Sequence, residues 1–387
     1  MSPQAKKEYL KAVWLRYKKA VLKTEKTKIL DEFCINCSLN RKYAIRRLRN
    51  FKIVRRKKEK KKPGPKPKYN QPQFLAVLKE IWITANLPCS KRLKAILPIW
   101  LPAYQKEFGA LAFEILKKLS KISPASIDRV LRPVRCLYRG KGKSATKPGL
   151  LLKHHIPIQT NQWNEKRPGF LETDTLMHCG NSLLGHYAVS TTAVDIATGW
   201  IEQRATYGKG QRDIADQIKN IEATLPFPIL GFDCDNGNEL LNQALMRYFL
   251  NRKIPVQYTR SRPYHSNDNA HVEGKNWTHV RQWLGYRRFE DPLIVGLLND
   301  LYKNEWRFFH NFFMPSVKLQ TKERIGSKII KRHDSPKTPY QRILDSKFIP
   351  PHTKQTLKDQ FEILNPFKLR KTIDKKIAII HKLARLP

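Results

Sequence analysis

Apolar residues recur at helical spacing through the first third of the chain. In residues 1–52 they mark three helices, and the third is expected to turn Tyr43, Ile45 and Leu48 inward. Basic side chains occupy the other faces of that third helix. A trihelical unit with a basic last helix predicts a helix-turn-helix domain that places this helix in the major groove of DNA. The alternative is a basic amphipathic helix on a solvated surface.

A second helical stretch spans residues 71–137. Ser123 and Pro124 predict the start of its last helix, because serine is a preferred N-cap and proline suits the first turn. Pro133 predicts that this helix ends near Arg132. We interpret the stretch as a second helix-turn-helix unit.

From Pro168 onward the pattern changes to strands that alternate with helices. Strands are expected at 170–177, 186–194, 200–207, 228–234 and 255–260, and helices at 211–224, 240–253, 269–284 and 293–309. The order β-β-β-α-β-α-β-α predicts a mixed sheet flanked by helices. The fourth strand is mostly apolar, which is typical of a central position.

The chain is strongly basic. Its 387 residues contain 75 Lys and Arg against 32 Asp and Glu, a net charge of +43, which favours a polyanionic partner. Residues 55–68 read RRKKEKKKPGPKPK and predict a linker, either an arm in the minor groove of DNA or a solvated tether. Residues 138–168 predict a second linker that follows DNA.

Neither a membrane span nor a signal peptide is expected, because the chain has no apolar run of 18 residues and no apolar N-terminal region. We expect a cytoplasmic, nucleoid-associated protein. The six cysteines are irregularly spaced and indicate no disulfide framework. Cys34 and Cys37 form a lone pair, for which buried structural cysteines are a better interpretation than a zinc site.

Three acids stand in settings that suit catalysis. Asp174 lies within the first strand of the expected sheet, Asp235 follows the fourth, and Glu273 lies four residues into a helix. Hard divalent ions take oxygen ligands, so carboxylates from two strands and a helix predict a two-metal site for phosphoryl transfer. Glu172 and Asp233 lie two residues earlier on the same strand faces, and each is an alternative ligand.

The motifs around these acids resemble a known family. They are Asp174-Thr175, Asp235-Asn236-Gly237-x-Glu239 and Pro263-Tyr264-x-x-Asn267-Asp268-Asn269-x-x-x-Glu273. Together they resemble the catalytic core of the retroviral-integrase superfamily, and within it a bacterial insertion-sequence transposase of the DDE type. The resemblance covers residues 168–315. One departure is Asp268-Asn269-Ala270, where many relatives have Asn-Gly.

This resemblance implies a ribonuclease-H-like fold, two Mg²⁺ or Mn²⁺ ions, and DNA strand cleavage and transfer. Asp174 is then expected to bridge both ions, while Asp235 and Glu273 each hold one. Asn276 would touch DNA or orient Glu273. His271 would hold a phosphate. The expected DNA contacts are Arg41, Lys42, Arg46, Arg47, Lys60, Lys61, Lys62, Lys66, Lys275 and Asn276.

We therefore expect a multidomain chain with N-terminal all-α helix-turn-helix units, a ribonuclease-H-like α/β catalytic domain and a small C-terminal module. The expected boundaries are 1–53, linker 54–70, 71–137, linker 138–167, catalytic 168–315 and basic C-terminal 316–387. The expected partner is double-stranded DNA, both element ends and target, with self-association of the chain on it. The alternatives are a noncatalytic DNA-binding protein derived from a transposase, and a ribonuclease-H-like nuclease without strand transfer.

Overall fold

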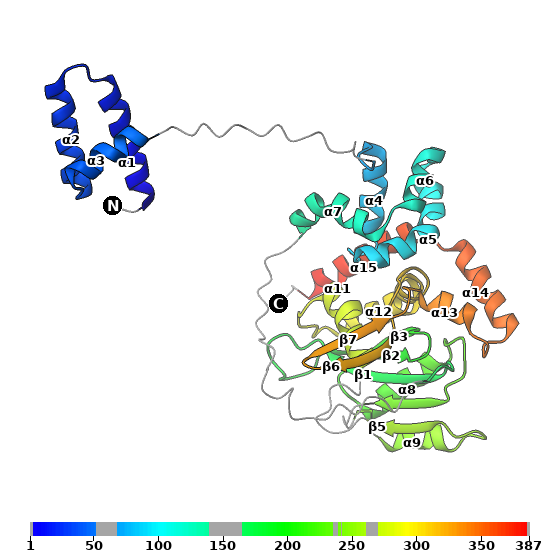
Figure 1. Cartoon of the computed structure of the whole chain (residues 1–387). Helices are drawn as coiled ribbons and strands as arrows, with labels where there is room; N and C mark the ends of the chain where they lie inside the picture. The colour runs from blue at the N-terminus through cyan, green and yellow to red at the C-terminus, as the bar shows by residue number, and fades with distance from the viewer. Residues whose placement is uncertain are drawn as a thin grey trace. The chain divides into compact units, whose positions relative to one another are not determined.

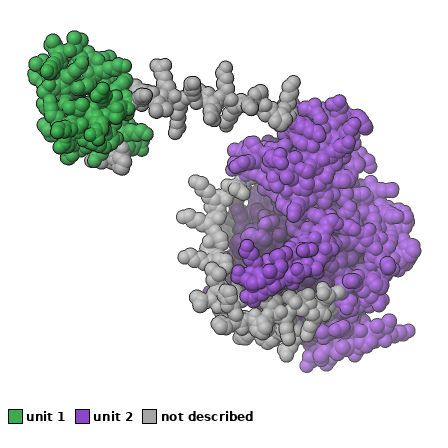
Figure 2. Space-filling view, viewed as in Figure 1, with its two compact units in different colours: residues 1–67 green, residues 68–387 purple. Residues whose placement is uncertain are grey.

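The computed structural model describes residues 3–51, 68–138, 165–234, 239–240, 242–260 and 270–384. The chain divides into two compact units, residues 1–67 and 68–387 (Figure 2). The two linker predictions fall almost wholly outside the described residues. No helix within the described ranges combines the length and the apolar character needed to cross a membrane.

The first unit contains the three helices that the sequence predicts, α1 (Pro3–Lys19), α2 (Lys23–Cys37) and α3 (Arg41–Asn50). Their core includes Phe33 of α2 and, on α3, Ala44 and Leu48. The expectation that Tyr43 and Ile45 point inward is wrong, because both are more than 40% exposed. The residues at 44 and 48 are four apart and share the buried face of α3, so the positions on either side of 44 turn away from it.

The second unit begins with four helices, α4 (Pro72–Thr84), α5 (Ser90–Phe108), α6 (Phe113–Lys121) and α7 (Pro124–Tyr138). The Ser123 hydroxyl accepts a hydrogen bond from the Ser126 amide at 3.2 Å, which confirms the predicted cap of α7. The predicted stop at Pro133 is wrong, because α7 continues to Tyr138. Ile127 is fully buried before the proline and Val134 packs on the same core after it, so tertiary packing offsets the lost backbone bond.

A mixed five-stranded sheet forms the centre of this unit (Figure 1). Its strands are β1 (Phe170–Met177), β2 (Ala188–Asp195), β3 (Ile201–Tyr207), β4 (Gly231–Cys234) and β5 (Gln257–Arg260). The order is β3-β2-β1-β4-β5. Strand β2 pairs antiparallel with both β1 and β3, whereas β4 pairs parallel with both β1 and β5. The expected mixed sheet is confirmed and is consistent with a ribonuclease-H-like core. In it, the first and fourth strands are adjacent.

Helices cover both faces of the sheet. They are α8 (Gln211–Glu222), α9 (Gln243–Leu250), α10 (Ala270–Lys275), α11 (Gln282–Leu284) and α12 (Pro292–Leu301). Three further stretches are π-helical: η2 (Asn276–Arg281), η3 (Tyr302–Trp306) and η4 (Phe309–Phe313). The expected helix at 269–284 is therefore helical from 270, but its middle is wound more widely than an α-helix.

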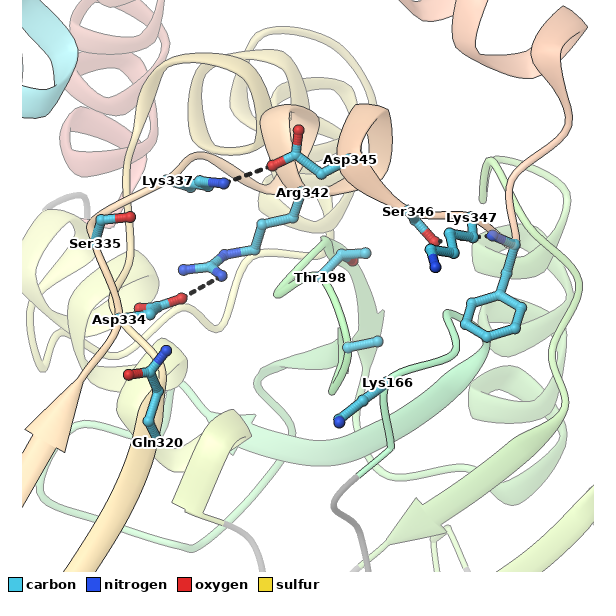
Figure 3. A pocket seen from close by; sticks show the side chains of 12 residues that line it. Lys166, Thr198, Gln320, Asp334, Ser335, Lys337, Arg342, Asp345, Ser346 and Lys347 are labelled. Carbon is cyan, nitrogen blue, oxygen red and sulfur yellow. Dashed lines mark hydrogen bonds and ion pairs between the residues drawn. The ribbon is translucent and has the colours of Figure 1, made fainter.

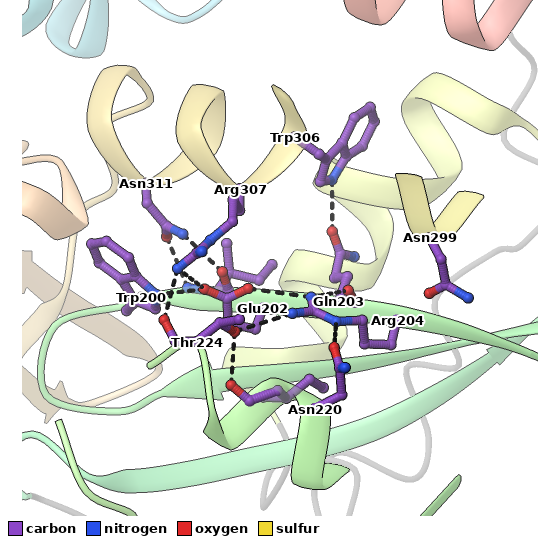
Figure 4. A network of polar contacts seen from close by, with 12 residues as sticks. Trp200, Glu202, Gln203, Arg204, Asn220, Thr224, Asn299, Trp306, Arg307 and Asn311 are labelled. Carbon is purple, nitrogen blue, oxygen red and sulfur yellow. Dashed lines mark hydrogen bonds and ion pairs between the residues drawn. The ribbon is translucent and has the colours of Figure 1, made fainter. Parts of the chain in front are cut away.

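Side chains from two flanking helices bind the backbone of β3 (Figure 4). The Asn311 amide donates to the Ile201 carbonyl and accepts from the Ile201 amide, both at 2.8 Å. Asn299 makes the same pair of bonds with Ala205, also at 2.8 Å. Between them, the Arg204 guanidinium donates to the Gln203 carbonyl at 2.6 Å. Since β3 is an edge strand, these bonds occupy its outer side.

The chain ends in a hairpin and three helices: β6 (Leu319–Ile325), β7 (Lys328–His333), α13 (Pro339–Asp345), α14 (Pro351–Ile363) and α15 (Pro366–Leu383). These helices pack on the rest of the unit. Trp100 of α5 meets Phe309 of η4 and Phe367 of α15 edge-on, at ring distances of 6.1 and 5.3 Å. The helices after residue 71, the sheet and the C-terminal helices thus share one hydrophobic core.

Candidate active site

Asp174 lies on β1, the middle strand of the sheet, and is partly exposed. One carboxylate oxygen accepts the Thr175 backbone amide and the other accepts the Asn276 side-chain amide, each at 2.8 Å. The Asn276 side chain was expected to touch DNA or to orient Glu273. The structure shows its contact with Asp174, because η2 turns this buried amide toward β1. Its contact with DNA stays a prediction.

Glu273 lies on α10, one turn before Asn276. It lines, together with Asp174, a cavity of about 300 Å³. The remaining lining residues of this cavity are Thr175, Leu176, Met177, Cys179, Asn276 and Arg281. Partial burial raises the pKa of Glu273. The structure therefore brings two of the three predicted acids to one cavity, from a strand and from a helix.

Asp235 lies outside the described residues, as do the motif residues 263–269. The described strand β4 ends one residue earlier, at Cys234, which pairs with Thr173 in the parallel register. Thr173 in turn precedes Asp174. Asp235 therefore stays a prediction.

The alternative ligand Glu172 has a structural role at the start of α10. The residue is only 2% exposed, and its carboxylate accepts hydrogen bonds from the backbone amides of His271 and Val272 at 3.0 and 3.1 Å. Burial raises the pKa of Glu172 to about 8, and the charges of Asp233 and Glu273 act in the same direction. Glu172 thus holds the first turn of the helix that carries Glu273.

The other alternative, Asp233, is also buried, and its carboxylate accepts the Thr259 hydroxyl at 2.6 Å. Asp233 lies directly across from Glu172 in the β1–β4 register. Glu172 and Asp233 are therefore buried neighbours on adjacent strands, and each carboxyl accepts hydrogen bonds from the groups named above.

A second set of contacts at Thr175 was not predicted. The Thr175 hydroxyl donates to Glu239 at 3.1 Å, and Lys209 forms an ion pair with the same Glu239 oxygen at 2.9 Å. Glu239 belongs to the quoted motif, which is the only sequence signal for this network. Lys209 lies in the turn after β3 and has no such signal. Together they tie the residue beside Asp174 to the segment after β4.

Arg281 was also missed. It ends η2 and lines the cavity, and it donates to the Met177 carbonyl of β1 at 2.9 Å. Its guanidinium lies 4.6 Å from the centre of the Tyr286 ring. Lys275 of α10 and Arg281 of η2 both follow Glu273 along the chain.

Lys275 and His271 lie on α10 beside Glu273. Burial, and then the charges of Arg92 and Arg342, lower the pKa of Lys275 to about 8. Burial, and then the charges of Lys318 and Lys275, lower the pKa of His271 to about 4. Positive groups from several elements therefore surround this end of the helix.

The predicted DNA contacts of α3 lie on the surface of the first unit. Arg41 is paired with Asp31, and Arg47 donates to the Tyr43 hydroxyl at 3.0 Å. The backbone amide of Lys42 donates to Asn40, which caps the helix. Arg46 is exposed. The remaining predicted contacts Lys60, Lys61, Lys62 and Lys66 lie outside the described residues.

All six cysteines are free thiols. Cys37 is buried in the core of the first unit and Cys34 packs against it. Within the part of the chain that the structure describes, no three His, Cys, Asp or Glu side chains gather as a metal-binding group.

The chain is similar in sequence to the uncharacterized protein y4rM of Sinorhizobium fredii (strain NBRC 101917 / NGR234). It is 32% identical over 347 residues, which cover 88% of this chain and 96% of the relative. The chain belongs to the y4rM family. No protein-family model matches this chain.

The solved structures that are similar to this chain include two from retroviruses. The catalytic core domain of BIV integrase is 16% identical, with a TM-score of 0.29, and the match covers 48% of this chain and 98% of that one. A chain of the simian T-cell lymphotropic virus intasome, in complex with PP2A regulatory subunit B56 gamma, is 15% identical. Its TM-score is 0.36, and the match covers 65% and 76% of the two chains. At these TM-scores, the assignment of the fold rests on the order and direction of the strands.

Proposed function

We propose that this chain is a transposase of the DDE type, which cleaves the ends of a DNA element and joins them to target DNA. The observation that carries the proposal is the shared cavity of Asp174 and Glu273. The two acids are 99 residues apart in the sequence, on the middle strand of a mixed sheet and on a helix. The net charge of +43 supports a nucleic acid as the substrate.

The residues at this cavity fit divalent metal ions. Asp174 and Glu273 provide carboxylate oxygens, the ligands that Mg²⁺ and Mn²⁺ prefer. The buried Asn276 Oδ1 has no hydrogen-bond partner among the described residues and adds an oxygen beside Asp174. Asp235 is the proposed third acid. Two bound ions would acidify a water molecule or a DNA 3′-hydroxyl and would stabilise the leaving oxygen.

The remaining residues hold these acids in place. Asn276 and the Thr175 amide fix both oxygens of Asp174, and Glu172 fixes the first turn of α10. Lys275 and Arg281 lie on the same helical stretch and would attract the DNA backbone to the cavity. Base and phosphate recognition by the first unit is a separate part of the proposal, since affinity and register come from contacts outside the reacting centre.

The test is a set of charge-neutralising variants, Asp174→Asn, Asp235→Asn and Glu273→Gln. Each is assayed with Mg²⁺ or Mn²⁺ for cleavage and joining of the DNA ends that flank the gene. We expect each variant to lose both activities and to keep its DNA affinity. The matched control is Asp216→Asn, which removes an exposed acid of α8 that is paired only with Lys219 among the described residues.

The outcomes separate the alternatives. Near wild-type cleavage by any of the three variants removes that residue from the site, and Glu172→Gln and Asp233→Asn are then assayed in its place. A wild-type chain that binds DNA but cleaves none with either metal is a noncatalytic DNA-binding protein. One that cleaves without joining is a nuclease.

Assembly on DNA follows from the same proposal. Each chain supplies one set of acids, so two DNA ends that react together need at least two chains. A closed twofold is the simplest arrangement. Mass measurements with paired DNA ends are expected to give a dimer or a larger assembly, and joining by a single chain per pair of ends would contradict this.

A further inference from the structure

The hairpin β6–β7 is exposed along its whole length. Every residue of both strands is exposed, including the apolar Ile325 and Ile329. Gly326, with φ 59°, begins a two-residue turn that closes the strands, as expected for a tight hairpin. An isolated two-stranded hairpin is marginally stable in water, so this ribbon depends on its base or on a partner.

The base of the ribbon is firmly held (Figure 3). Asp334 accepts the Lys318 amide at 2.6 Å and forms an ion pair with Arg342 of α13, also at 2.6 Å. The Lys318 ammonium donates to the Ala197 carbonyl, in the turn between β2 and β3, at 2.6 Å. The ribbon is therefore a fixed projection from the second unit.

One face of the ribbon is positively charged. In the antiparallel register Lys322 lies opposite Lys331, and Arg324 lies opposite Ile329 on the same face. Like charges directly opposite each other destabilise a strand pair. None of these three cations forms an ion pair with another described residue. The cost of the Lys322–Lys331 pair is relieved when an anion lies across it.

We propose that the β6–β7 ribbon enters the major groove of double-stranded DNA, with Lys322, Arg324 and Lys331 against the phosphates. A two-stranded ribbon fits this groove, which is about 12 Å wide. Charge complementarity favours DNA over a second copy of the chain, since a second copy carries the same charge of +43. The inference rests on DNA being the substrate in the proposed function, but it does not depend on the cleavage chemistry.

The test compares two double variants of the full chain. Lys322→Gln/Lys331→Gln removes the opposed lysines, and the control Lys358→Gln/Lys375→Gln removes two exposed lysines of α14 and α15. Affinity for a fluorescent 30-base-pair duplex is measured by anisotropy over a salt series in EDTA, so that no strand is cleaved. Losing two phosphate contacts lowers the slope of log affinity against log salt by about 1.8, a roughly 30-fold loss at 0.15 M salt.

Two further measurements guard the result. Lys322→Glu places opposite charges across the ribbon, so it favours the free hairpin while weakening DNA binding, and any loss therefore does not come from unfolding. Protection of guanine N7 from methylation reports the major groove, and we expect the wild type and the control to protect sites that the ribbon variant leaves open.

The proposal is overturned if the ribbon variant and the control bind DNA with the same slope and the same protection. It is also overturned if the ribbon variant changes the mass of the DNA-free chain without changing its DNA affinity, because the ribbon is then a contact between copies. A wild type that shows ribbon-dependent binding but never cleaves DNA contradicts the proposed function and leaves the ribbon inference standing.

Discussion

Replacing His310 by phenylalanine should make the protein less sensitive to acid. His310 lies on η4, is 1% exposed, and neither ring nitrogen has a hydrogen-bond partner among the described residues. Its ring centre lies 4.1 Å from that of His279. Burial, and then the charges of Lys275 and Arg370, hold the pKa of His310 well below its usual value of 6.5.

The sign of the effect follows from proton uptake. The folded chain keeps His310 neutral, whereas the unfolded chain protonates it below a pH of about 6.5. Stability is therefore fully present above that pH and is lost as the pH falls toward the folded pKa. One such histidine lowers the free energy of unfolding by about 1.4 kcal/mol for each unit that the pH falls below the unfolded pKa. His310→Phe removes this loss, and any packing cost of the larger ring is the same at each pH.

The assay is urea unfolding of the full chain at pH values from 7.5 to 5, followed by tryptophan fluorescence. Trp306 and Trp283 lie 4.8 and 5.6 Å from the His310 ring and report this part of the core. The difference in unfolding free energy between variant and wild type should grow by about 1.2 kcal/mol between pH 6 and pH 5, since the unfolded pKa of about 6.5 lies close to this range. The control is His352→Phe, which removes a histidine from the exposed surface of α14. Parallel curves for the wild type and His310→Phe would refute the reasoning.

Three other predictions concern separate parts of the molecule. Asn276→Ala removes the amide that holds Asp174, and we expect cleavage to fall about 10- to 100-fold with unchanged DNA affinity; equal cleavage rates would show that this bond is dispensable. Asn311→Ala leaves both backbone groups of Ile201 without their partner and should lower the free energy of unfolding by about 2–4 kcal/mol in urea; a loss below about 1 kcal/mol would mean that water replaces the amide. Arg46→Ala and Arg47→Ala should each weaken binding to element-end DNA by about 1–3 kcal/mol relative to random DNA, and an equal effect on both DNAs would limit these residues to phosphate contacts.

Local sequence patterns predicted where helices and strands lie more accurately than they predicted how these elements pack together. The first strand begins and ends at the predicted residues, 170 and 177, where apolar pairs close both ends of the polar run at 172–175. Helix α7 ran past Pro133, since burial on both sides of the proline outweighs one lost hydrogen bond. The π-helical winding of η2 had no sequence signal, although it sets the direction of Asn276.

The candidate site shows the same division. Asp174 and Glu273 were predicted from their settings, and the structure places both at one cavity. The role of Glu172 was not predictable, because its partners are backbone amides 99 and 100 residues further along the chain. Neither was the contact of Lys209 with Glu239, which depends on how the turn after β3 meets the segment after β4.

The side-chain bonds along β3 have a consequence for how copies of this chain meet. Asn311, Arg204 and Asn299 occupy backbone groups of Ile201, Gln203 and Ala205, which are the positions that a further strand would need. An exposed strand edge is a template for aggregation, and here side chains stand in for the missing neighbour. Crowded copies are therefore kept from joining their sheets through this edge. Any ordered assembly has to use other surfaces.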